Sequence, residues 1–115
     1  MDADSGALPP DQLALAVEVF RMLADGTRIQ ILWSLIDGER SVNDLATAIG
    51  KPAPSVSQHL AKLRLARIVA ARQDGTRVFY RLANEHAGQL VTDAVHQAEH
   101  ALGQPRHHQT TTDPA

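Results

Sequence analysis

Residues 41–82 read SVNDLATAIGKPAPSVSQHLAKLRLARIVAARQDGTRVFYRL, and this stretch decides the fold of the chain. A short helix can begin at Ser41, because the serine hydroxyl can cap its first turn and Asp44 completes a near capping box three residues later. Apolar residues recur on one face of this helix, and Gly50 ends it. The first part of the stretch therefore predicts a helix followed at once by a tight turn.

A second helix follows the turn. Pro54 stands where a first helical turn tolerates a missing N–H, and Val56, Leu60 and Leu63 recur at i, i+4 and i+7. Hydroxyls and an amide near the start of this helix, with basic residues further along, suit a helix that lies in the major groove of DNA. The candidates for reading bases are Ser55, Ser57, Gln58 and His59. The candidates for contacting phosphates are Lys51, Lys62 and Arg64.

Two runs of β-branched and aromatic residues come next, at 68–72 and 77–81, around the segment QDGT. Asp-Gly between such runs is a strong hairpin signal. Arg72 and Arg77 flank the turn, where a wing would meet phosphates or the minor groove, so both are further DNA-contact candidates. The order of these elements predicts a winged helix-turn-helix. The alternative is a helical pair and a β-ribbon that only build a small core.

Basic charge is concentrated in the same part of the chain. The 115 residues have a net charge of −2. Residues 51–81, however, carry 7 basic and 1 acidic side chains, whereas residues 1–50 and 82–115 are acidic overall. A basic middle between acidic ends is an electrostatic footprint of nucleic-acid binding that the net charge conceals.

The chain length indicates one domain, with a flexible lead-in at 1–10, the domain at 11–102 and a flexible histidine-containing tail at 103–115. The sequence has no cysteine, which excludes disulfides and thiolate metal sites. No stretch resembles a membrane span or a signal peptide, so we expect a cytoplasmic protein. A phosphate-binding loop, a nucleophile elbow and paired carboxylates are all missing, so we do not expect an enzyme.

The flanking segments predict three more helices, which gives a mainly α fold with a β-hairpin wing in the order ααααββα. The first helix, from Asp11 to about residue 24, is apolar on more than one face, so either deep burial or a subunit interface remains open. The second, at about 28–36, should be the central core element, with Trp33 packed in it. The last, at about 84–102, has a face of small residues and valines that suits pairing with the first helix in a homodimer.

Histidine is concentrated near the C-terminal end. Five of the six histidines occur at or after residue 86, namely His86, His96, His100, His107 and His108. Imidazole is a common ligand for nickel, cobalt and zinc, and Glu99 adds a carboxylate. His86 and His100 would lie about 21 Å apart along one helix, so only two antiparallel copies could bring them to one ion. The alternative is a set of solvated histidines.

Residues 20–82 contain FRMLADGTRIQILWSL, SVNDLA and SVSQHLAKLRLARIV, which resemble the ArsR/SmtB family of bacterial metal-sensing repressors. The resemblance implies a homodimer of winged helix domains paired through the first and last helices. It also implies a repressor that binds an inverted repeat in double-stranded DNA and releases it when metal binds. Metal that bridges the paired last helices would favour a dimer with the wrong spacing of recognition helices.

The resemblance further implies the ligand set of the family's nickel and cobalt sensors. The corresponding positions are His86, Glu99, His100, His107 and His108, with His96 as an auxiliary ligand only. Six nitrogen and oxygen ligands suit octahedral nickel or cobalt, and zinc is a third candidate effector.

Two other site types of the family are disfavoured. Many members carry a Cys-x-Cys site where this chain has Val42 and Asn43. The family's usual four-ligand site in the last helix has Asn84 and Gln97 at two of its positions, and an amide is a weak ligand.

Two alternative functions remain open. One is a DNA-binding regulator of the same family that is controlled by a partner protein or acts as an activator, with its histidines incidental. The other is a dimeric protein-interaction module without DNA, which conflicts with the basic segment.

Overall fold

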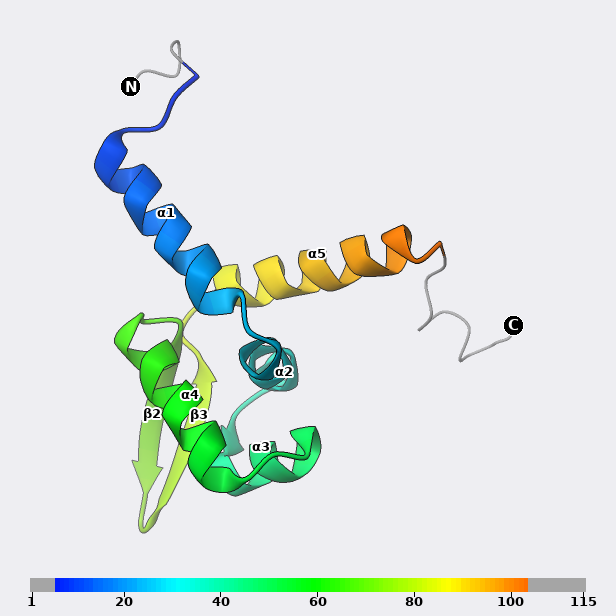
Figure 1. The fold of residues 1–115 in the computed structure, drawn as a ribbon. Coiled ribbons are helices and arrows are strands. Elements are labelled where there is room, and N and C mark those ends of the chain that lie inside the picture. The colour runs from blue at the N-terminus through cyan, green and yellow to red at the C-terminus, as the bar shows by residue number, and fades with distance from the viewer. Residues whose placement is uncertain (1–5, 104–115) are drawn as a thin grey trace.

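The computed structural model describes residues 6–103 (Figure 1). The predicted tail ligands His107 and His108 lie outside the described residues, as do positions 1–5 of the lead-in. The elements, in order, are α1 (Pro10–Leu23), α2 (Gly26–Leu35), β1 (Arg40–Ser41), α3 (Val42–Ile49), α4 (Ala53–Leu65), β2 (Val69–Asp74), β3 (Arg77–Leu82) and α5 (Glu85–Ala101). The predicted winged helix-turn-helix is confirmed, with one short strand in addition.

The helix-turn-helix forms where the local signals placed it. The Ser41 hydroxyl accepts a hydrogen bond of 3.1 Å from the backbone N–H of Asp44, which caps α3. Gly50 ends α3 with a φ of 71°, a left-handed conformation that glycine adopts without strain. Val56, Leu60 and Leu63 are fully buried, so one face of α4 is fixed against the core and the opposite face is left exposed.

The wing is a two-stranded antiparallel hairpin widened by β1. Asp74 pairs with Arg77, so the turn has two residues, and Gly75 has a φ of 65° there. The additional strand β1 pairs with β3 through Arg40 and Ser41, and the strand order is β1-β3-β2. Because β1 has only two residues, the alternation of apolar and polar side chains that indicates a strand cannot be seen in its sequence.

The core lies between α2, α3, α4 and the sheet, and includes the fully buried Ile31, Leu32 and Leu45. Trp33 is 43% exposed, so the prediction that it packs is wrong for the single protomer, because it lies on the side of α2 turned away from this core. α1 begins at Pro10, one residue before the predicted start at Asp11, and Asp11 does not cap it. The cap position is Pro9, and the Asp11 carboxylate accepts from the adjacent backbone N–H of Gln12.

The outer helices α1 and α5 extend from this body and diverge from each other (Figure 1). α1 buries only Leu23, whereas Leu13 is 50%, Leu15 70% and Phe20 62% exposed. Deep burial of α1 is therefore excluded within one protomer. No helix within residues 6–103 is long and apolar enough to cross a membrane.

Candidate nucleic-acid interface and candidate metal ligands

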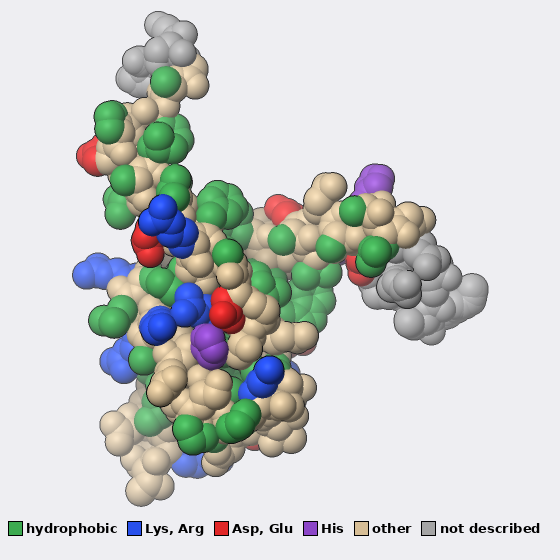
Figure 2. All heavy atoms as spheres, in the orientation of Figure 1, with side chains coloured by type: hydrophobic (Ala, Val, Ile, Leu, Met, Phe, Trp, Pro, Cys, Tyr) green, Lys and Arg blue, Asp and Glu red, His purple; other side chains and the backbone are tan. Residues whose placement is uncertain are grey.

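Helix α4 carries most of the predicted DNA-contact residues. Ser57, Gln58, Lys62 and Arg64 are exposed, and Lys51 is exposed in the turn before the helix. Ser55 is half-buried at the start of the helix. The first turn of α4 contains no acidic residue, so its positive end remains favourable for phosphate. Figure 2 shows lysine and arginine side chains gathered over α4 and the adjoining end of α1.

The wing arginines differ in their surroundings. Arg72 donates from Nε to both carboxylate oxygens of Glu39 at 3.1 Å and from Nη2 to Oε1 at 2.9 Å. These hydrogen bonds lower the pKa of Glu39 below its ordinary value. Arg72 and Arg77 both approach the ring of Phe79, at 5.0 Å and 4.9 Å from its centre. Arg72 is therefore held by a carboxylate, which reduces the positive charge that it offers to DNA.

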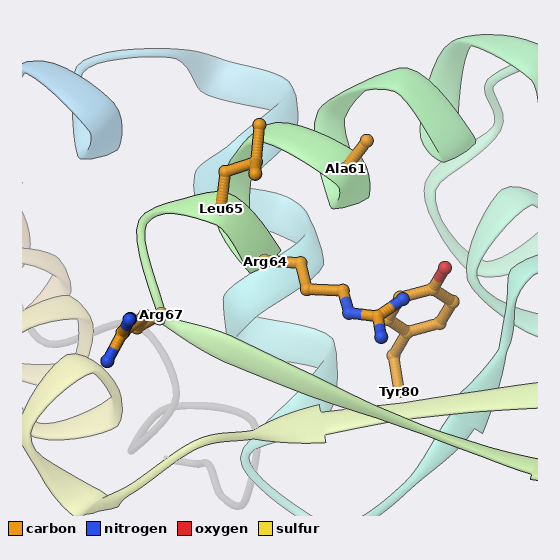
Figure 3. Close-up of a pocket in the computed structure, with 5 residues that line it drawn as sticks. All are labelled: Ala61, Arg64, Leu65, Arg67 and Tyr80. Carbon is orange, nitrogen blue, oxygen red and sulfur yellow. The ribbon is translucent and has the colours of Figure 1, made fainter.

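A groove of about 560 Å³ lies between the end of α4 and the wing (Figure 3). Its lining residues are Ala61, Arg64, Leu65, Arg67 and Tyr80. In Figure 3, Arg64 extends from α4 in the direction of Tyr80, and Arg67 lies at the other end of the groove. Two guanidinium groups and a phenol can bind anions such as phosphate. Arg67 and Tyr80 were not among the sequence candidates, although Arg67 belongs to the basic segment.

Arg67 occupies a backbone conformation that usually requires glycine. Its φ is 62°, the only positive value at a non-glycine position in residues 6–103. Arg67 N–H donates to Arg64 at 2.9 Å and Ile68 N–H donates to Leu63 at 2.9 Å. These two bonds form a Schellman motif, in which glycine is preferred at the left-handed position. An arginine there costs about 1 kcal/mol or more of local strain.

His59 is placed differently from the other predicted base-reading residues. Its side chain is 22% exposed, and its Nδ1 accepts a hydrogen bond of 3.1 Å from Nε of Arg28 in α2. An oxygen of Asp25 lies 3.9 Å from the same nitrogen. No local pattern could have revealed this contact, because Arg28 lies 31 residues earlier in the chain.

Asp25 caps α2, although the sequence suggested only a helix break at this point. Its carboxylate accepts from Arg28 N–H at 3.0 Å, and this hydrogen bond is the main reason that the pKa of Asp25 is lowered. We expect Asp25→Ala to lower the free energy of unfolding by about 1 kcal/mol at pH 7. Urea unfolding of the variant and the wild type measures the difference.

The same cap predicts a pH dependence. A carboxyl whose pKa is lowered by folding stabilises the folded state above its unfolded-state pKa of about 3.9, and the contribution is lost as the pH falls through the lower folded-state value. The penalty of Asp25→Ala should therefore shrink below about pH 4. Asp25→Asn is the matched control, because an amide oxygen can keep the cap without titrating. An undiminished alanine penalty in acid would contradict the assignment.

The predicted metal ligands of α5 lie along one extended helix. His86, His96 and His100 are exposed, and Glu99 is half-buried. Among residues 6–103, no group of three histidine or acidic side chains could hold a metal ion. Asn84 is the N-cap, and its side-chain oxygen accepts from His86 N–H at 2.9 Å, which occupies this oxygen in the cap. One described protomer therefore does not assemble the predicted site.

An apolar groove of about 330 Å³ lies where α1, α2 and α5 meet. Its lining residues are Phe20, Leu23, Ala24, Ile29, Leu90, Val91 and Ala94. Phe20 and Leu90 are both exposed large apolar side chains. Phe20 belongs both to this groove and to the exposed apolar residues of α1.

Comparison with known proteins shows which family this chain resembles. A family model described as bacterial regulatory protein, arsR family, matches residues 25–71. The chain is 69% identical to the HTH-type transcriptional regulator KmtR of Mycobacterium tuberculosis, over 94% of this chain and 85% of that protein. It is 41% identical to the HTH-type transcriptional repressor SmtB of Mycobacterium tuberculosis, over 82% of this chain and 70% of that protein.

A solved structure agrees with the sequence relatives. It is the solution structure of the homodimeric winged helix-turn-helix DNA-binding domain of a possible ArsR-family transcriptional regulator from Mycobacterium bovis. The TM-score is 0.75 at 36% identity, and the match covers 87% of this chain and 93% of that chain. The chain thus belongs to the arsR family of bacterial regulatory proteins, and its function is the regulation of transcription rather than catalysis.

Proposed function

We propose that this chain forms a homodimer that binds an inverted repeat in DNA through two copies of α4 and the wing, and that nickel or cobalt releases the DNA. The observation that carries the proposal is that the structure separates a basic exposed surface from exposed apolar helices. The basic, exposed side of α4 lies on the central body, and the outer helices α1 and α5 carry unburied apolar residues.

The DNA part of the proposal rests on chemistry and exposure. Ser57 and Gln58 can bond base edges from the major groove, and Ser55 lies beside them at the start of α4. The cations proposed to contact phosphates are Lys51, Lys62, Arg64, Arg67 and Arg77. Arg72 contributes less, because Glu39 shares its charge. A phosphate strand that runs between α4 and the wing would meet the groove beside Arg64 and Arg67 (Figure 3).

The dimer part rests on the apolar surface of α1 and α5. A 115-residue chain that leaves Leu13, Leu15 and Phe20 at least half exposed has apolar area that a second copy can cover. The related solution structure is that of a homodimer. Two-fold symmetry would also place two α4 helices to read two half-sites of an inverted repeat.

The metal part requires that dimer. The proposed ligands are His86, Glu99, His100, His107 and His108. His86 begins α5 and His100 ends it, so an antiparallel pair of α5 helices would bring His86 of one protomer near the second protomer's copy of His100. Imidazole and carboxylate donors without thiolate suit nickel, cobalt or zinc, and an octahedral site of nitrogen and oxygen donors suits the first two.

The response of DNA binding to metal would follow from the connection between α5 and the wing. β3 ends at Leu82 and α5 begins at Glu85, so a shift of α5 reaches the wing through two residues. Metal need only bind more tightly to the dimer geometry that fits DNA poorly. A coupling of about 1–3 kcal/mol would weaken DNA binding roughly 5- to 150-fold.

Titration of nickel, cobalt and zinc into the full-length protein bound to its own promoter DNA tests the proposal. We expect nickel or cobalt to release the DNA, measured by fluorescence anisotropy at fixed salt. DNA binding that is indifferent to all three metals would overturn the metal part and leave control by a partner protein. The absence of salt-dependent duplex binding would overturn the DNA part.

Arg67 provides a test in which stability and DNA binding change in opposite directions. We expect Arg67→Gly to raise the free energy of unfolding by about 1 kcal/mol, because glycine relieves the left-handed strain. The same change should weaken DNA binding and reduce the slope of log affinity against log salt by about 1, as expected for one lost phosphate contact. Arg67→Lys is the control that keeps the charge and the strain. Unchanged affinity and slope in the glycine variant would exclude the contact.

A further inference from the structure

Three helices meet at the side chain of Arg28. Its Nε donates to Nδ1 of His59 in α4 at 3.1 Å. Its Nη1 donates to the backbone oxygen of Met22 at 3.2 Å and lies 3.1 Å from the sulfur of the same residue, in the last turn of α1. Its backbone N–H is held by the Asp25 cap at the start of α2. One guanidinium group thus connects the end of α1 with the middle of α4.

The atoms used at His59 show which chemistry this contact requires. Nδ1 accepts a proton donor, so it must be unprotonated, and the ring proton is then on Nε2. The nearest carboxylate, Asp25, is 3.9 Å from Nδ1, beyond hydrogen-bonding distance, so Arg28 is the partner at this nitrogen. The ring is also mostly shielded, with 22% of its side chain exposed. The hydrogen-bonded nitrogen of His59 therefore faces the start of α2.

We propose that Arg28 and His59 are positioning residues, which set the orientation of α4 relative to the end of α1, and that His59 does not read a base. This inference rests on the proposed function, because it concerns how α4 is presented to DNA. α1 carries the proposed dimer surface, and its last turn is bonded to Arg28. A change in how two α1 helices pair therefore has a direct route to α4, in addition to the route through α5 and the wing.

The two roles of His59 predict different patterns of operator recognition. A base-reading side chain matters at one base pair, so its loss should remove discrimination at that pair and leave the others unchanged. A positioning side chain acts on all contacts of α4, so its loss should weaken binding to every operator variant by a similar factor. Arg28 should then reproduce the effect of His59, although it belongs to another helix.

The experiment measures the affinity of the full-length dimer for its operator and for a set in which each base pair of the half-site is replaced in turn. We expect His59→Leu and Arg28→Met each to weaken binding about tenfold across the whole set, as expected for one hydrogen bond to a charged group. The double variant should be no weaker than either single variant. His59→Gln should bind like the wild type, because its amide oxygen can accept from Arg28.

Several results would overturn the inference. These are loss of discrimination at a single base pair in His59→Leu, independent and additive losses in the double variant, or unchanged affinity in both single variants. Thermal unfolding identifies a variant that does not fold. If His59→Gln unfolds like the wild type but loses discrimination at one base pair, that result also overturns the positioning role. A wild-type protein that binds no duplex would overturn the proposed function and this inference together, whereas the first three results overturn this inference alone.

Discussion

Replacement of Phe20 by aspartate is expected to convert the dimer into monomers and to reduce operator affinity by at least a hundredfold. Phe20 is 62% exposed on α1 and lines the apolar groove formed with α2 and α5. A central aromatic residue commonly contributes about 2 kcal/mol or more to an interface, and two-fold symmetry applies the loss twice. The dimer dissociation constant should therefore rise roughly a thousandfold.

The loss of DNA affinity follows because the two half-sites are then bound independently. Linking two binding modules raises the overall affinity by about 10²–10⁴ through effective concentration, and monomers forfeit this gain. Sedimentation gives the oligomeric state, and anisotropy gives the affinity. Gln12→Asp is the matched control, because it places the same charge at an exposed polar position of α1. A Phe20→Asp protein that remains dimeric at nanomolar concentration would contradict this use of α1.

The parts of the fold that the sequence predicted are those fixed by local chemistry. The Ser41 cap, the Asp-Gly turn and the spacing of Val56, Leu60 and Leu63 each act within a few residues, and all were confirmed. The features that the sequence did not predict depend on residues far apart in the chain. β1 is stabilised by pairing with a strand almost forty residues later along the chain, and its own two residues carry no periodic signal.

The candidate interface was predicted by residue type rather than by contacts. Charge and helix position correctly indicated which part of the chain is basic and exposed. They could not reveal that Arg72 faces Glu39, or that His59 faces Arg28, since each partner lies more than thirty residues away. Helical spacing also cannot distinguish an apolar face buried in the protomer from one covered by a second copy. The exposure of Leu15 and Phe20 in the structure excludes the first alternative for α1.

The metal ligands show a further limit. A sequence gives the distance between His86 and His100 along one helix, and the structure confirms that α5 spans both. Neither gives the position of the second protomer's helix. A ligand set divided between protomers is therefore visible only as separate histidines on an exposed helix, and an experiment with mixed dimers is required to bring the halves together.

Dimers assembled from one His86→Ala chain and one His100→Ala chain should recover a metal response that both parent variants lack. If each site takes His86 from one protomer and His100 from the other, either variant alone damages both sites of its dimer. In the mixed dimer one site loses both histidines, and the other retains both. We expect nickel or cobalt to weaken the operator affinity of the wild type roughly 5- to 150-fold, and to leave the operator affinity of both parent variants unchanged.

The mixed dimer also separates this arrangement from a site built within one chain. A site within one protomer would lose a ligand in each half of the mixed dimer, so no intact site would remain and the response would stay absent. Two affinity tags on co-expressed chains isolate the mixed species, and calorimetry counts the tightly bound ions, with one per mixed dimer expected against two in the wild type. Gln97→Ala, at an exposed position of α5, is the control, because it leaves every proposed ligand in place. Recovery of both tight binding and DNA release only in the mixed dimer would assign the effector site to the pair of α5 helices, since no other pairing of the two defective chains restores a complete set.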